Sequence, residues 1–118
     1  QFSGAYLPLW NFRNNGQLIE FKGDKMPIGV HPKDNNSFST IDVEINSGDK
    51  IYMFTDGYYS QLGFEKNEKM LIKPLKQTLS EIYNFPMLQQ KLILEQHLAK
   101  WKGNKDQTDD ILMLGLKL

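Results

Sequence analysis

Two short acidic motifs stand directly beside apolar segments of this sequence. Asp56 and Gly57 follow the segment 51–55, and Asp109 and Asp110 directly precede the segment 111–118. If these segments are antiparallel neighbours in a sheet, both motifs lie at one rim and their carboxylates converge. Converging carboxylates need a proton, a cation or water between them. Oxygen donors without histidine or cysteine favour a hard cation such as Mg²⁺ or Mn²⁺, and the glycine would allow a sharp turn.

A purely structural interpretation of the two motifs is also open. Asp-Gly is a common turn, and paired aspartates are common where a loop meets water. Spacing alone favours this ordinary interpretation, so the metal hypothesis needs support from the rest of the chain.

The other side chains that could act chemically have weaker support. The two histidines stand apart: His31 is expected in a loop, and His97 on a solvated helix face. Neither predicts a metal or acid–base site. Ser3 has no partnered histidine, so a serine nucleophile is unsupported. The chain has no cysteine, which excludes a disulfide, a thiolate metal site and a cysteine nucleophile.

The first half of the chain is predicted to consist of strands. Segments 5–12 and 17–22 flank an Asn-Gly pair, the strongest short signal for a hairpin. Residues 40–46 alternate between apolar and polar side chains, which predicts a strand with one solvated face. Residues 51–54 are apolar throughout, which predicts a central strand covered on both faces.

The second half is predicted to be helical until its last segment. Leu75, Leu79 and Ile82 recur at helical spacing. A second helix is expected from about residue 86 to 101, with a glycine just past its end. Residues 111–118 form the last strand. About five mainly antiparallel strands and two grouped helices predict an α+β fold.

Size and charge exclude several classes of protein. The 118 residues suit one domain, and 40% hydrophobic residues suffice for a core. Fourteen basic and fourteen acidic residues cancel, so no charge favours nucleic acid or an anionic membrane. The longest apolar run, 111–116, is far shorter than the ~20 residues that span a bilayer.

Four segments occur in a recognisable order along the whole chain. They are residues 3–9 (SGAYLPL), 26–29 (MPIG), 48–57 (GDKIYMFTDG) and 109–112 (DDIL). Together they resemble the SpoIIE-like serine phosphatase domain, a group of the metal-dependent PPM (type 2C-like) protein phosphatases. The block that runs from Gly-Asp through an apolar strand to Thr-Asp-Gly is the most specific, and the late Asp-Asp pair strengthens it.

The resemblance implies a two-sheet α-β-β-α sandwich with a two-metal Mg²⁺ or Mn²⁺ centre at one end. A phosphoserine or phosphothreonine on a protein would be hydrolysed there by metal-activated water. The family's metal ligands fall on Asp56 and Asp109 of this sequence. Gly57 and Asp110 are then backbone or supporting residues of the same site.

The resemblance further implies that residues 1–118 are the C-terminal part of a single phosphatase domain. The family domain is longer, and its first half carries an Asp-Gly motif whose carboxylate bridges both metals. This sequence has no second motif of that kind, so we expect the segment alone to be inactive. It also departs from the family at residues 60–61, where an acidic residue is common, and at Leu112, where a hydroxyl residue is common.

The parent protein is therefore expected to be a bacterial signalling phosphatase in the cytoplasm, with any sensor or membrane region upstream. Its expected substrate is a phosphorylated regulatory protein of the anti-anti-sigma kind. The alternative is a non-catalytic phosphatase fold that binds a protein partner, and an intact upstream Asp-Gly motif would favour the enzyme. Because half a sandwich exposes apolar strands, a homodimer is also expected.

Overall fold

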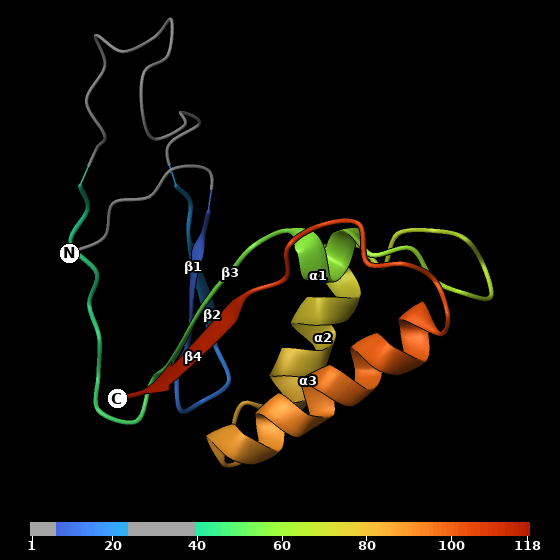
Figure 1. Cartoon of the computed structure of the whole chain (residues 1–118). Helices are drawn as coiled ribbons and strands as arrows, with labels where there is room; N and C mark the ends of the chain where they lie inside the picture. Colours follow the sequence, from blue (N-terminus) through green and yellow to red (C-terminus); the bar gives the residue numbers. More distant parts are fainter. Residues whose placement is uncertain (1–6, 24–39) are drawn as a thin grey trace, which may run out of the picture.

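The computed structural model describes residues 7–23 and 40–118, which form one antiparallel sheet with helices packed on one face (Figure 1). The strands are β1 (Leu9–Phe12), β2 (Leu18–Phe21), β3 (Lys50–Phe54) and β4 (Met113–Lys117), in the spatial order β2-β1-β3-β4. The helices are α1 (Gly57–Ser60), α2 (Ile72–Ile82) and α3 (Met87–Lys102). The predicted α+β class is confirmed. No helix among these residues has the length and apolar character that crossing a membrane requires.

The hairpin between β1 and β2 forms at the predicted Asn-Gly turn. Gly16 has a φ of +86°, a conformation that side chains rarely adopt. The amide of Gln17 donates to the Asn15 side-chain oxygen at 3.0 Å, which closes the turn. The two strands then pair from Leu9 opposite Phe21 to Phe12 opposite Leu18.

The core lies between the sheet and the helices. Large buried aromatic side chains of β1 and β3 face buried aliphatic side chains of α2 and α3; they include Trp10, Phe12, Tyr52, Phe54, Leu75, Leu79, Ile82 and Leu94. Trp10 and Phe54 meet edge to face, with ring centroids 4.6 Å apart. The three α2 residues at helical spacing are all buried, as predicted, so this stripe holds α2 on the sheet.

The opposite face of the sheet is apolar and only partly covered. Leu9 and Ile51 are buried there against Val43. β3 is central, as predicted, and it is buried on the helix face, while on this face Ile51 is buried and Met53 only partly so. Leu114 and Leu116 of β4 pair with Met53 and Ile51 of β3 and share this face, but they are about half exposed, at 50% and 48%. The described part of the chain is therefore a helix layer on one sheet, with an open apolar surface behind it.

Two expectations about the elements need correction. Residues 40–46 form no strand, so the described residues contain four strands rather than five. Alternation produces a strand only where a neighbouring strand pairs with its backbone, and none of the four strands pairs with this segment. A third, one-turn helix also follows β3. The expectations for Ser3, His31 and residues 26–29 lie outside the described residues.

Asp49 anchors the turn that leads into β3. The side chain is buried and accepts hydrogen bonds from the Asn46 amide at 2.9 Å and the Asn11 side chain at 3.1 Å. The hydrogen bond from the Asn46 amide lowers the pKa of Asp49 below its ordinary value of 3.8, although burial acts in the opposite direction. The hydrogen bond from the Asn11 side chain and the positive charges of Arg13 and Lys50 lower this pKa further.

Asp49→Asn should lower the free energy of unfolding by about 1–2 kcal/mol at pH 7, because the charged acceptor of two hydrogen bonds is lost. The folded pKa lies below the unfolded one, so the carboxylate stabilises the protein above pH 3.8 and loses that effect as pH falls through the folded value. Urea unfolding at pH 7 and below pH 4 checks this. The difference between variant and wild type should shrink in acid, and a constant difference would contradict the assignment.

Candidate functional site

The pairing of β3 with β4 brings the two acidic motifs to the same end of the sheet. The strands are adjacent and antiparallel, as predicted, and the last regular pair joins Phe54 to Met113. Just beyond it the amide of Thr55 donates to the carbonyl of Leu112 at 2.9 Å. Asp56, which follows β3, and Asp110, which precedes β4, therefore lie at the same end of the sheet. Figure 1 shows the segment that leads into β4 passing beside α1.

Gly57 lies against the backbone of Asp110. A Cβ atom at Gly57 would stand 2.2 Å from the Asp110 carbonyl oxygen and 3.0 Å from Cγ1 of Ile111. The φ of Gly57 is not positive, so this glycine does not serve the sharp turn expected from the sequence. It permits two backbone segments to touch, which fixes Asp56 close to the Asp109–Asp110 segment.

The three aspartates at this end are exposed and accessible to a ligand. Asp56 stands at the start of α1, but its carboxylate makes no capping hydrogen bond. Burial raises the pKa of the Tyr59 hydroxyl, and the negative charge of nearby Asp56 raises it further. The field of Asp56 thus acts on this end of α1, where a cation would be attracted.

The donor chemistry suits Mg²⁺ or Mn²⁺, since every candidate ligand is a carboxylate oxygen. The number of donors falls short of a complete site: within residues 7–23 and 40–118, no three acidic or histidine side chains converge on a common point. Asp56 and Asp109 alone therefore do not complete a metal site, and further oxygen donors would be needed to hold a cation there.

Two side chains to which the sequence analysis gave no role hold the segment that leads into β4. The Thr55 hydroxyl donates to the Asp110 carbonyl at 2.8 Å and accepts from the Leu112 amide at 3.0 Å. The buried side chain of Gln61 donates to the Asp106 carbonyl at 3.0 Å. Thr55 stands inside the Thr-Asp-Gly motif, which is a usable signal. Gln61 lies where the sequence departs from the family at residues 60–61, but that departure does not predict its bond to Asp106.

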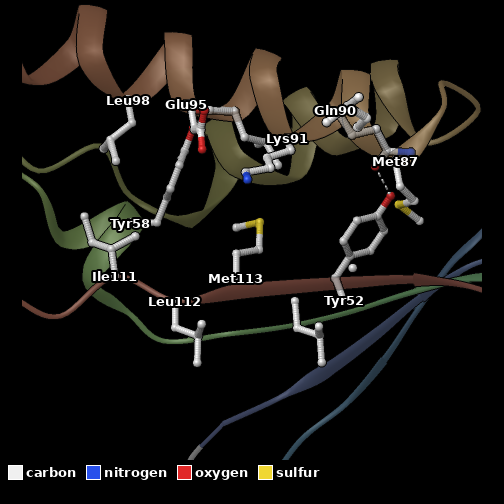
Figure 2. Close-up of a pocket in the computed structure, with 14 residues that line it drawn as sticks. Tyr52, Tyr58, Met87, Gln90, Lys91, Glu95, Leu98, Ile111, Leu112 and Met113 are labelled. Atoms are coloured by element: carbon white, nitrogen blue, oxygen red, sulfur yellow. Dashed lines mark hydrogen bonds between the residues drawn. The ribbon is translucent and has the colours of Figure 1, made fainter.

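A separate groove of about 640 Å³ lies between α3 and β4. Figure 2 shows Met113 pointing into it toward α3, while Leu112 points to the other side of β4. The Tyr52 hydroxyl at its floor donates to Gln90 at 2.6 Å. Burial raises the pKa of both Tyr52 and Tyr58 to about 12, so neither hydroxyl ionises at pH 7. This apolar groove suits the binding of an apolar segment better than acid–base chemistry.

His97 lies exposed on α3, as expected, and lines neither the acidic end of the sheet nor the groove between α3 and β4.

Comparison with known proteins places this geometry in context. Residues 3–118 match the sequence family described as Stage II sporulation protein E (SpoIIE). Among solved structures, the SiaA-PP2C domain of Pseudomonas aeruginosa is similar, with a TM-score of 0.86 and 26% sequence identity. The similarity covers 98% of this chain and 45% of that one, so the chain spans less than half of the length of its structural relative. No curated protein sequence matches the chain.

Proposed function

The chain belongs to the SpoIIE family of PP2C-like phosphatase domains, and from this membership we propose that it is the C-terminal part of a metal-dependent protein serine/threonine phosphatase. The observation that carries the proposal is the contact of the Asp56–Gly57 turn with the Asp109–Asp110 segment at one end of the sheet. A site of this kind needs acidic side chains from distant parts of the sequence, and the close approach of Gly57 to Asp110 supports a shared site for Asp56 and Asp109.

We assign roles to four residues. The carboxylates of Asp56 and Asp109 would hold Mg²⁺ or Mn²⁺ at the exposed end of the sheet. Because Gly57 has no side chain, its backbone can lie against Asp110. The Asp110 carbonyl accepts the Thr55 hydroxyl and so supports the segment that carries Asp109. When bound, the metal ions would activate water and neutralise charge on the phosphoryl group of the substrate.

The remaining ligands are proposed to come from the preceding part of the same domain. The similar SiaA-PP2C structure is more than twice as long as the matched region, which leaves room for ligands from another part of such a domain. That part would also cover the open sheet face, where Leu112, Leu114 and Leu116 are exposed. If the face stays uncovered, a second copy of the chain is the other way to bury it, as a homodimer.

The wider role is proposed from the family. The substrate would be a phosphorylated regulatory protein of the anti-anti-sigma kind, in a bacterial signalling pathway and in the cytoplasm. The exposure of Asp56 and Asp109 supports a macromolecular substrate, since a phosphorylated side chain on a protein surface can reach them.

A second candidate function is a phosphatase fold that binds a protein partner without catalysis. The groove between α3 and β4 favours it, because it offers a mostly apolar surface of suitable size, with Lys91 and Glu95 as the only charged side chains among the described residues that line it. The two candidates differ in whether an intact metal-ligand set precedes this segment.

The experiment is a phosphatase assay of the full-length protein on a phosphoserine-containing regulatory protein. We expect phosphate release that requires Mn²⁺ or Mg²⁺ and stops when a chelator removes the metal. A protein that binds the phosphorylated partner, yet releases no phosphate at any metal concentration, would support the binding module instead. The upstream sequence offers a second check, since the enzyme requires an Asp-Gly metal motif there.

A further inference from the structure

We propose that Thr55 is a positioning residue for the metal site, a role that rests on the proposed function. Its hydroxyl donates to the Asp110 carbonyl at 2.8 Å and accepts from the Leu112 amide at 3.0 Å. Its own amide donates to the Leu112 carbonyl at 2.9 Å. A single residue next to Asp56 thus makes three hydrogen bonds to the segment that follows Asp109.

These bonds begin where the regular sheet ends. The ladder between β3 and β4 closes at the pair of Phe54 and Met113. Asp109 lies before the start of β4, beyond the reach of ladder bonds. The Thr55 side chain extends the connection to Asp110, the direct neighbour of Asp109. A hydroxyl can do this because it donates and accepts at the same time, which no apolar side chain of similar shape can do.

A second attachment holds the other end of the same segment. The side chain of Gln61 donates to the Asp106 carbonyl at 3.0 Å, and the Trp101 indole donates to the Gln61 carbonyl at 2.8 Å. Residues 106–110 are therefore tied at one end by Gln61 and at the other by Thr55. Asp109 lies between the two attachments, so its backbone is held at the end of the sheet that carries Asp56.

Positioning of this kind matters because a metal site is sensitive to small displacements of its ligands. Side chains that orient ligands without touching the metal typically contribute about 10–100-fold to metal affinity or activity. Loss of the Thr55 hydroxyl would free the Asp110 carbonyl and let Asp109 move away from Asp56. The fold would persist, because the core lies between the sheet and the helices and excludes Thr55.

The test compares Thr55→Val with Thr55→Ser in the full-length protein. Valine keeps the shape and removes the hydroxyl, while serine restores it. We expect the dissociation constant for Mn²⁺, measured by calorimetry well below the unfolding temperature, to rise at least about tenfold in Thr55→Val. Thr55→Ser should bind Mn²⁺ like the wild type. Thr78→Val is the matched control, since the Thr78 hydroxyl makes no hydrogen bond to any residue that the structure describes.

The outcomes separate this inference from the proposed function. If Asp56→Asn loses Mn²⁺ binding but Thr55→Val keeps wild-type affinity, the metal site stands and the role of Thr55 is overturned. If Asp56→Asn also keeps wild-type affinity, the assigned ligand is wrong and the inference falls with it. A merely structural role would lower the unfolding temperature of Thr55→Val and leave the affinity unchanged. Should Thr55→Val fail to fold, Thr55→Cys, whose thiol is a weak donor and acceptor, must bind Mn²⁺ less tightly than Thr55→Ser.

Discussion

Replacing Asp56 by Asn in the full-length protein should reduce metal-dependent phosphate release by about 100-fold or more. The amide of Asn is similar in shape but uncharged, so a divalent cation loses a charged ligand that hard metals prefer. Stability should change by less than about 0.5 kcal/mol, because Asp56 is exposed and its side chain makes no capping bond. Initial rates over a range of Mn²⁺ concentrations, together with thermal unfolding, measure both effects.

The matched control is Asp42→Asn. Asp42 is also exposed, but it lies in the irregular segment 40–46, whose Val43 packs on the face of the sheet opposite the helices. It should change neither turnover nor stability. Asp109→Asn should lose activity in the same way as Asp56→Asn. Full activity of Asp56→Asn, or an equal loss in Asp42→Asn, would remove the main physical support for the metal site.

The proximity of the two acidic motifs was predictable because strong local patterns flank them. The apolar run of β3 predicted a central strand, and the Asp-Gly and Asp-Asp motifs at the ends of two strands predicted a shared rim. Antiparallel pairing then needs no further information to bring Asp56 and Asp110 together. The α2 stripe was predictable for a similar reason, since a helix with one apolar face has to bury it.

The misses have a common cause in tertiary context. The alternation of residues 40–46 is a strand pattern only if another strand pairs with it, and the pattern does not say whether one does. Thr55 and Asp110 are 55 positions apart in the sequence. A hydrogen bond between a polar side chain and a distant carbonyl leaves no periodic trace. The Thr-Asp-Gly motif marks the position of Thr55, but its partners, like those of Gln61, become visible only in the folded structure.

The close approach of Gly57 to Asp110 leads to the second large effect. Gly57→Ala should lower the free energy of unfolding by about 1–3 kcal/mol, because its Cβ would stand 2.2 Å from a carbonyl oxygen. That oxygen belongs to the backbone and accepts the Thr55 hydroxyl, so it cannot rotate aside as a flexible side chain would. The clash is relieved only if α1 or the Asp109–Asp110 segment shifts, and either movement separates the candidate ligands. Urea unfolding and Mn²⁺ calorimetry of the full-length variant measure the two consequences.

Gly115→Ala is the control that isolates the cause of this effect. Gly115 lies on β4, where an added Cβ would stand 3.3 Å from the Tyr52 ring and 3.5 Å from the Met87 sulfur. These are side-chain atoms that can adjust, and alanine suits a strand at least as well as glycine, so the change in stability should stay below about 1 kcal/mol. Mn²⁺ affinity should be unchanged, since Gly115 lies inside β4 and does not contact the Asp109–Asp110 segment. If Gly57→Ala were as mild as Gly115→Ala in both measurements, the two backbones would not be in contact, and Asp56 would not be held beside Asp109.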